Sequence, residues 1–231
     1  SDRRTGFQIA GPKVREVLQA CTRADVGAMK FLDVRRMVVG QADCIVQRVS
    51  YTGDLGFEIY CDIMDQRSLW HTLWNAGQPH GMIPFGMRAM MSLRLDRFFG
   101  SWLREFSPDY TAAETGIDRF IDWKRSNFIG HAPAAAERDV PPARQLVTFI
   151  VEAEDADVTA YEPVFINGEV AGFCTSGGYS HHMGQSVAYA LVPRASVADD
   201  LEVEIELLGK RRKARLALDS GFDPEGVRLR G

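Results

Sequence analysis

Residues 51–60 read YTGDLGFEIY, and this stretch decides how the first half of the chain folds. It joins two β-rich runs, residues 44–51 and 57–61, through a short segment that carries two glycines and an aspartate. Glycine-bearing segments between such runs are typical of β-hairpin loops, and glycine lets another group approach the backbone closely. We therefore predict a hairpin whose loop brings Tyr51 and Glu58 near each other.

Glu58 is the first candidate binding residue, because it is a lone carboxylate in an otherwise apolar strand. Its two oxygens can accept paired hydrogen bonds from a ligand edge with two adjacent N–H donors. Pterins, guanines and guanidinium groups have such an edge. Alternatively, Glu58 points outward while Phe57 and Ile59 face the core, as the two-residue period of a strand allows.

The composition is that of a folded protein. Of 231 residues, 45% are hydrophobic and 25% charged, which is unlike a disordered chain. A net charge of −4 gives no overall field that attracts nucleic acid or an anionic membrane. No apolar run reaches the length of a membrane span. The four cysteines form no CxxC pair, so we expect reduced, buried thiols in a cytoplasmic protein.

Three helices are predicted in the first half of the chain. One follows Gly11 and Pro12, one runs from an N-cap at Asp65 to Gly77, and one spans residues 85–98. The third carries the arginines Arg88, Arg94 and Arg97, which form a solvated face or a cationic site for carboxylates. Helices alternating with hairpin strands predict an α+β fold, with helices covering one face of an antiparallel sheet.

The second half is predicted to be a separate β domain. Residues 131–144 are rich in alanine and proline, which favours a boundary there, and we predict domains at 1–140 and 141–231. Six short strands follow, at residues 145–151, 163–166, 169–175, 186–192, 201–208 and 213–218. Asn167-Gly168 and Gly209-Lys210 are typical of tight hairpin turns. Such strands indicate a small antiparallel barrel or sandwich.

The 51–60 stretch resembles the tetrahydrofolate-site signature of the aminomethyltransferase family, the T-protein of glycine cleavage. It is most similar to the folate domain at the C-terminal end of dimethylglycine and sarcosine dehydrogenases. The similarity continues in the family's order through RAMMSLRLD (88–96), NFIG (127–130), NGEVAG (167–172), TSGGYS (175–180) and VEIELLGK (203–210). This resemblance implies an α+β folate-binding domain that is incomplete at its N-terminus, followed by a small antiparallel β-barrel.

The resemblance also implies a function: tetrahydrofolate binding, with transfer of a one-carbon unit from an amine or iminium to the folate. It implies that Glu58 anchors the pterin edge, that Tyr51 packs or bonds beside it, and that Arg88 receives the glutamate tail. The TSGGYS segment becomes a loop that closes over folate, or an ordinary barrel loop. Met90 replaces a pterin-contacting arginine of the family. The family's catalytic aspartate has no counterpart here, so no catalytic residue is assigned.

Other functions are weighed against this one. The chain has no GxGxxG, P-loop, GxSxG or HExxH motif, so we expect it to bind no flavin, nucleotide or metal. The basic run at 210–213 is interpreted as a solvated hairpin tip. An alternative function is a non-catalytic folate-binding or interaction module that partners a flavin-dependent amine dehydrogenase. The iron–sulfur maintenance branch of the superfamily is disfavoured, because its cysteine motif is missing.

Overall fold

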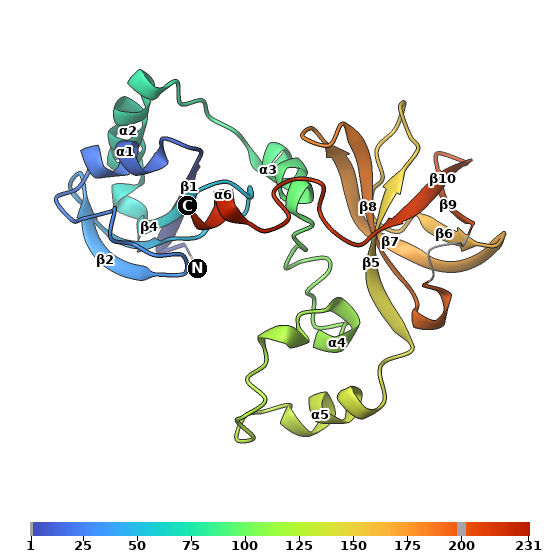
Figure 1. Cartoon of the computed structure of the whole chain (residues 1–231). Coiled ribbons are helices and arrows are strands. Elements are labelled where there is room, and N and C mark those ends of the chain that lie inside the picture. Colours follow the sequence, from blue (N-terminus) through green and yellow to red (C-terminus); the bar gives the residue numbers. More distant parts are fainter. Residues whose placement is uncertain (1, 198–201) are drawn as a thin grey trace. The chain divides into compact units, whose positions relative to one another are not determined.

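A computed structural model describes residues 2–197 and 202–231 of the chain (Figure 1). These residues form two structural units. The first comprises residues 2–97 and 223–231, and the second comprises residues 98–222. Along the sequence, the second unit therefore interrupts the first, whose final segment is the C-terminus of the chain.

The first unit is built on a four-stranded antiparallel sheet. Its strands are β1 (Arg4–Ala10), β2 (Val34–Val39), β3 (Ala42–Gln47) and β4 (Gly56–Asp62), in the order β1-β4-β3-β2. The predicted hairpin is confirmed, since β3 pairs with β4 and Gln47 lies opposite Glu58. The strand β3 ends before the predicted limit at Tyr51, so the connecting loop is longer than expected.

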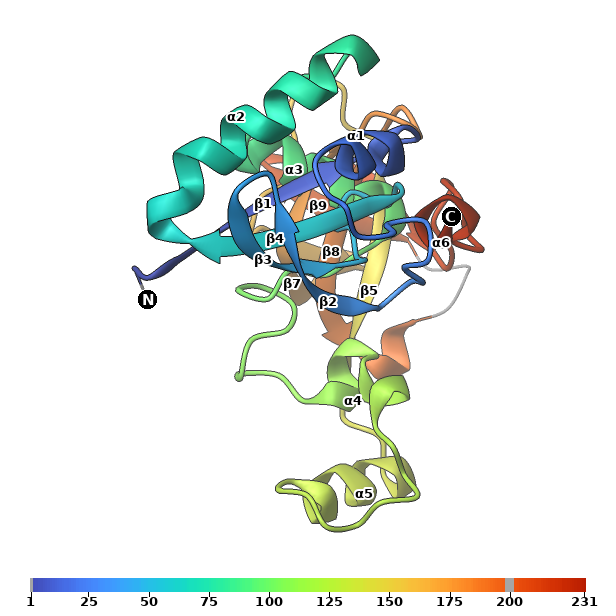
Figure 2. The ribbon, with the colours of Figure 1, turned by 90° about the vertical axis from the view of Figure 1, so that its left-hand side faces the viewer.

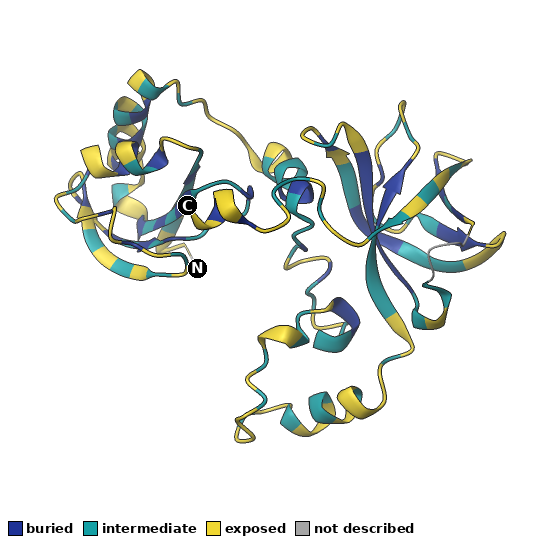
Figure 3. Cartoon of the chain, in the orientation of Figure 1, coloured by how far each residue is buried: buried dark blue, intermediate teal, exposed yellow. Residues whose placement is uncertain are grey.

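Two helices, α1 (Val14–Ala20) and α2 (Gln66–Gly77), cover one face of this sheet, as predicted (Figure 2). Their buried side chains and the inward residues of β4 share one core (Figure 3), which includes Val14, Leu18, Leu69, Leu73, Phe57, Ile59 and Cys61. The 3-10 helix η1 (Ile63–Asp65) leads into α2. Asp65 precedes α2 as predicted, but its side chain makes no capping hydrogen bond.

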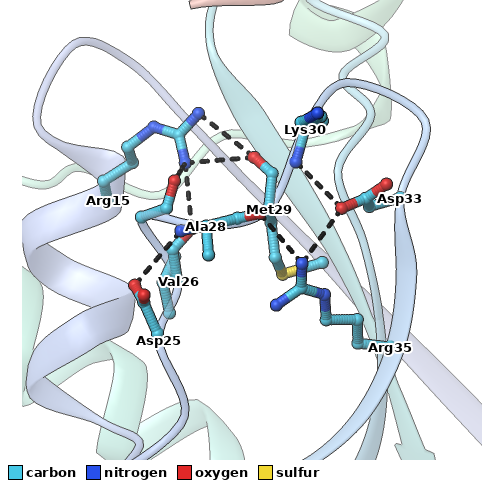
Figure 4. A network of polar contacts seen from close by, with 9 residues as sticks. Arg15, Asp25, Val26, Ala28, Met29, Lys30, Asp33 and Arg35 are labelled. Carbon is cyan, nitrogen blue, oxygen red and sulfur yellow. Dashed lines mark hydrogen bonds and ion pairs between the residues drawn. The ribbon is translucent and has the colours of Figure 1, made fainter.

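Arginine side chains hold the connection between α1 and β2 (Figure 4). Arg15 donates hydrogen bonds to the backbone carbonyls of Val26, at 2.9 Å, and Met29, at 3.4 Å. Arg35 pairs with the carboxylate of Asp33 at 3.2 Å. Since Val26 and Met29 are buried, these bonds keep two core side chains in place.

A buried arginine joins the hairpin loop to the C-terminal segment. The fully buried guanidinium of Arg48 donates to the carbonyl oxygens of Gly56, at 3.2 Å, and Leu229, at 3.0 Å. Leu229 lies in the short helix α6 (Val227–Arg230) and is itself buried. Burial, followed by the charge of Arg15, lowers the pKa of Arg48. The loop before β4 is therefore anchored at the same point as the chain's end.

The segment after α2 carries the third predicted helix in shortened form. It consists of η2 (Gln78–His80), α3 (Met87–Leu93) and the 3-10 helix η3 (Arg94–Arg97). Arg88 is exposed. Arg94 is fully buried, so the prediction of a solvated arginine face is wrong at that residue. Arg94 begins the 3-10 helix η3, in which the side-chain spacing differs from that of the predicted continuous α-helix.

The second unit contains a closed antiparallel β-barrel, which confirms the predicted fold class. Its strands are β5 (Arg144–Val151), β6 (Pro163–Ile166), β7 (Glu169–Ser180), β8 (Gln185–Pro193), β9 (Val203–Leu207) and β10 (Lys210–Ala217), in the order β10-β5-β8-β7-β6-β9. All six predicted strands are present, and the predicted start of β9 at Leu201 lies outside the described residues. Asn167 and Gly168 have φ of 53° and 82°, which confirms the predicted two-residue turn.

Helices precede the barrel in this unit. They are α4 (Ala112–Thr115), η4 (Asp118–Phe120) and α5 (His131–Asp139), and η5 (Arg194–Ser196) follows β8. Pro133 falls in the first turn of α5, where proline removes no intrahelical bond, and Pro141 and Pro142 lie between α5 and β5. Residue 140, the predicted boundary, lies within the second unit, and the predicted division into domains at 1–140 and 141–231 remains a prediction.

Two other local predictions for the barrel are corrected. The TSGGYS segment, residues 175–180, is part of β7 and not a loop. The basic run at 210–213 is the first half of β10 and not a hairpin tip. Its Arg212 pairs with Asp155 at 2.6 Å. Alternation places Arg211 and Lys213 on the face opposite Ala214 and Leu216, which pack against the barrel core.

The four cysteines are free and buried, as predicted. Burial raises the pKa of Cys44 to about 11 and that of Cys174 to about 12. Since the thiolate is the reactive form, these thiols serve as core side chains.

Candidate ligand-binding site

The first unit contains a cavity of about 910 Å³ along its edge strand β1. Volumes of this order are typical of small-molecule sites. The wall is formed by β1, the outward residues of β4, helix α2, and the segment from His80 to Leu93. Its side chains include Phe7, Gln8, Thr52, Asp54, Glu58, Tyr60, Trp70, Trp74, Ile83, Phe85, Met87 and Met90.

Aromatic rings and methionines form the apolar part of this wall. Trp70 and Trp74 lie one turn apart on α2, and their rings are nearly parallel with centroids 5.8 Å apart. Phe7 of β1 packs on Trp70 at 5.9 Å. Met87 and Met90 contribute from α3. Aromatic faces favour flat rings, and methionine side chains adapt to irregular shapes. This part of the wall suits a planar, weakly polar ligand.

Glu58 and Tyr60 supply a polar pair to the same cavity. Both lie on the face of β4 opposite the core, because strand side chains alternate. The Tyr60 hydroxyl donates to Oε2 of Glu58 at 2.6 Å. Burial raises the pKa of Tyr60 to about 12, together with the hydrogen bond and charge of Glu58. The phenol therefore stays a donor at neutral pH, and the carboxylate is held as an acceptor.

A row of hydroxyl and amide groups continues from this pair. Gln8, which lies opposite Glu58 in the sheet, donates from Nε2 to the Ser50 hydroxyl at 3.2 Å. The Ser50 and Thr52 hydroxyls are 2.9 Å apart, and both residues are buried. Gln8, Thr52 and Glu58 all line the cavity. These polar groups are linked to one another by hydrogen bonds and share the cavity wall with the aromatic side chains.

Of the two glycines in the predicted loop, Gly53 has a left-handed backbone conformation. Gly53 has a φ of +86°, and a Cβ there would lie 2.3 Å from Cγ of Arg97. Only glycine fits both the backbone angle and the space. Next to it, Asp54 lines the cavity and pairs with Nε of Arg228 at 3.3 Å.

Of the three predicted binding residues, the cavity brings in Glu58 alone. Tyr51 is not among the residues that line it, and Gln47 rather than Tyr51 lies opposite Glu58. Arg88 is exposed on α3, beside the cavity-lining Met87. The roles of Tyr51 and Arg88 remain predictions.

Sequence reasoning missed Tyr60 and the tryptophan pair as site residues. The signal for Tyr60 was present: it lies two positions after Glu58 and therefore shares its face. Trp70 and Trp74 lie at positions i and i+4 of the helix predicted at residues 65–77, a spacing that does not distinguish a packing face from a cavity wall. In the structure both line the cavity, and Trp70 is 41% exposed.

The histidines 181 and 182 lie in the second unit and contact aromatic rings. His181 packs edge-on against Tyr179, with ring centroids 5.1 Å apart, and the ring centroids of His182 and Phe222 are 4.0 Å apart.

Among the described residues, no group of three or more His, Cys, Asp or Glu side chains is placed to hold a metal ion. No helix in the described part of the chain is both long and apolar enough to cross a membrane.

Two family models match the chain in succession. The GCVT N-terminal domain matches residues 1–125, and the glycine cleavage T-protein C-terminal barrel domain matches residues 144–223. The second match corresponds to the barrel. The first includes the cavity and its polar pair.

Individual relatives match nearly the whole chain. It is 36% identical over 209 residues to human dimethylglycine dehydrogenase, mitochondrial, covering 89% of this chain and 24% of that protein. It is 31% identical over 208 residues to the aminomethyltransferase of Moorella thermoacetica, covering 90% of this chain and 57% of that protein. The chain therefore spans about a quarter of the first relative and a little over half of the second.

A solved structure shares the fold. The glycine cleavage system aminomethyltransferase T from Bartonella henselae superposes with a TM-score of 0.82 at 24% identity, covering 98% of this chain and 60% of that one. At this identity the comparison concerns the fold alone.

Proposed function

Since the chain belongs to the glycine cleavage T-protein (aminomethyltransferase) family, we propose that it binds tetrahydrofolate in the cavity of its first unit. Glu58 receives the N–H edge of the pterin, and Trp70 and Trp74 lie beside the ring system. The observation that supports this most is the carboxylate of Glu58, which accepts a hydrogen bond from Tyr60 and lines the same cavity as two tryptophans.

The pterin edge suits this carboxylate. A reduced pterin presents a ring N–H next to an amino group, and a carboxylate accepts such a pair with one bond to each oxygen. Within the described part of the chain, Oε1 of Glu58 accepts no hydrogen bond from protein, and Oε2 has a second lone pair besides the one facing Tyr60. Both oxygens can therefore meet a donor.

The remaining contacts of the ligand follow from the wall. Thr52 and Gln8 offer neutral groups beside the pterin, and the methionines adapt to the linker that follows it. Arg88 is exposed and follows the cavity-lining Met87 in the sequence, and we propose that its guanidinium binds the carboxylates of the folate tail. Tyr51 is proposed to support the loop beside the pterin.

The reaction we propose is transfer of a one-carbon unit from an amine or iminium to tetrahydrofolate. The contribution of the first unit is to hold and orient the acceptor, which lowers the barrier by positioning. We assign no general acid or base to the described residues. Asp54 lines the cavity, but its pairing with Arg228 suits it to a structural role.

A second candidate function is a folate-binding module that partners a flavin-dependent amine dehydrogenase without catalysis of its own. The match to a quarter of human dimethylglycine dehydrogenase supports it. A folate-binding chain that yields no methylenetetrahydrofolate when supplied with dimethylglycine and a flavin dehydrogenase would favour this alternative over the enzyme.

The binding proposal is tested by calorimetric titration with tetrahydrofolate. We expect Glu58→Gln to weaken binding by about 1–3 kcal/mol, because a charge-assisted acceptor is lost at a partly buried site. Glu169→Gln is the matched control: Glu169 is an exposed strand glutamate in the barrel, and its affinity should equal that of the wild type. Equal affinities for Glu58→Gln and the wild type would remove Glu58 from the site.

A further inference from the structure

Tyr60 touches the candidate binding carboxylate directly. Its hydroxyl donates to Oε2 of Glu58 at 2.6 Å, and both side chains line the cavity. The two residues are separated by one position of β4 and so lie side by side on its outer face. A hydrogen bond this short, from a neutral phenol to a carboxylate, is of the charge-assisted kind.

The ring of Tyr60 reaches this position because its neighbour across the sheet is glycine. Gly6 of β1 lies opposite Tyr60 in the antiparallel register. A Cβ at residue 6 would lie 2.8 Å from Cε1 and 2.9 Å from Cδ1 of the Tyr60 ring. Real Cβ atoms do not approach carbon this closely, so any larger residue would push the ring away. The ring therefore occupies the space that a side chain at residue 6 would fill.

We propose that Tyr60, lying over Gly6, is a positioning residue that fixes the carboxylate of Glu58 in the orientation that receives paired N–H donors. This proposal rests on the proposed function, since it takes the pterin edge as the ligand group.

The physical reason is the freedom of a glutamate side chain. A glutamate on a strand has three rotatable bonds, and ordering them on binding reduces affinity. The Tyr60 hydroxyl holds one oxygen before the ligand arrives, which sets the plane of the carboxylate. Oε1 then points its lone pairs away from Tyr60, and the second lone pair of Oε2 stays available. The ligand thus meets an acceptor pair that is already aligned.

A selectivity follows from the same arrangement. A fixed carboxylate favours ligands whose two donors are adjacent and coplanar, and a mobile one adapts to a single donor. Removing the Tyr60 hydroxyl should therefore weaken the binding of tetrahydrofolate more than the binding of an analogue that lacks the 2-amino group. A residue that only stabilises the fold would weaken both ligands alike.

The first experiment is a double-mutant cycle in tetrahydrofolate binding with Tyr60→Phe and Glu58→Gln. We expect Tyr60→Phe to weaken binding about three- to tenfold, the equivalent of one lost hydrogen bond. In the Glu58→Gln background the same change should have an effect of less than about twofold, because the orientation of the carboxylate no longer matters. Tyr161→Phe, which removes an exposed hydroxyl in the second unit, is the matched control and should bind like the wild type.

Gly6→Ala tests the place of the ring with the hydroxyl still present. The added methyl group should displace the Tyr60 ring and weaken tetrahydrofolate binding to a similar degree as Tyr60→Phe. Combined with Glu58→Gln, it should add little. An equal loss in both backgrounds would show that the methyl group acts by filling the cavity, and would overturn the role assigned to Gly6.

The outcomes separate this proposal from the binding proposal. If the wild type does not bind tetrahydrofolate, both fall together. If the wild type binds and Glu58→Gln weakens it, but Tyr60→Phe binds like the wild type or loses equal affinity in both backgrounds, only the positioning role falls. Circular dichroism and thermal unfolding of each variant show whether a loss of binding reflects a loss of fold.

Discussion

The two units place a partly or fully buried glutamate in opposite settings. In the barrel unit, Glu105 is fully buried. It accepts hydrogen bonds from the Thr175 hydroxyl and the Ser101 backbone N–H, each at 2.6 Å, and from the Ser176 hydroxyl. In the first unit, Glu58 accepts one bond, from Tyr60, and faces a cavity.

The difference shows that the surroundings of a carboxylate decide whether it stabilises the fold or is available to bind a ligand. The oxygens of Glu105 are occupied by protein donors, which join the segment after residue 98 to strand β7. Glu58 keeps acceptor capacity that only a ligand or water can use. A buried polar group that is fully bonded stabilises a fold, whereas one left partly open in a hollow is suited to recognition.

The largest effect should come from breaking the occupied carboxylate. Glu105→Ala removes the common acceptor of two hydroxyls and a backbone N–H, and it leaves a small void. We expect the free energy of unfolding to fall by about 2–4 kcal/mol, measured by urea denaturation. Glu58→Gln should lower it by no more than about 0.5 kcal/mol. A reversed order of the two losses would break the distinction.

The aromatic wall should matter for the ligand and little for the fold. Trp74→Leu removes one of the two parallel rings beside the cavity but keeps an apolar side chain on α2. We expect tetrahydrofolate affinity to fall by about 1 kcal/mol, the size of an aromatic contact beyond burial. Fluorescence titration against Trp102→Leu, an exposed tryptophan of the second unit, provides the comparison. Unchanged affinity in the Trp74 variant would place the pterin elsewhere.

Stability at alkaline pH tests the hydrogen bond between Tyr60 and Glu58. Burial and Glu58 raise the pKa of Tyr60 to about 12, above the value of about 10 in an unfolded chain. The phenol is therefore harder to ionise in the folded state. Its contribution to stability is present below pH of about 10 and is lost as pH rises toward 12.

The measurement compares the wild type with Tyr60→Phe. Unfolding free energies followed from pH 9 upward should decline more steeply for the wild type, and absorbance at 295 nm should show a late-ionising phenol that the variant lacks. Parallel decline of the two curves would mean that the hydroxyl does not bond to Glu58 in solution.

The smallest effect is expected at Arg88. Its guanidinium is exposed, so an ion pair with the folate tail is screened by solvent. We expect Arg88→Gln to weaken tetrahydrofolate binding by about 0.2–1 kcal/mol at low salt. This difference from the wild type should vanish near 1 M salt. A loss that persists at high salt would indicate a more buried contact than the exposed position of Arg88 provides.

Much of the fold could be predicted from local patterns. The hairpin before Glu58, the helices on one face of the sheet and all six barrel strands follow from alternation, turn residues and caps. The errors came where distant contacts decide the local structure. The TSGGYS segment looks like a loop by its glycines, but pairing with β8 makes it strand. Arg94 was predicted on a solvated helix face, but it is buried at the start of η3.

The candidate site could be predicted only in part, for a related reason. Glu58 stands out because a lone carboxylate in an apolar strand is visible in the sequence. The packing of the Tyr60 ring over Gly6 depends on the register between β1 and β4, which no local sequence pattern reveals. The contribution of Trp70 and Trp74 likewise depends on the packing of α2 against β1, where Phe7 contacts Trp70.

The most direct measurement is a crystal structure of the chain with bound tetrahydrofolate. We expect the pterin to lie between the two tryptophans and β4, with its ring N–H and amino nitrogen each about 2.7–3.2 Å from a different oxygen of Glu58. We also expect the Tyr60 hydroxyl to remain bonded to Oε2. A pterin whose N–H edge points away from Glu58, or one bound outside this cavity, would contradict it.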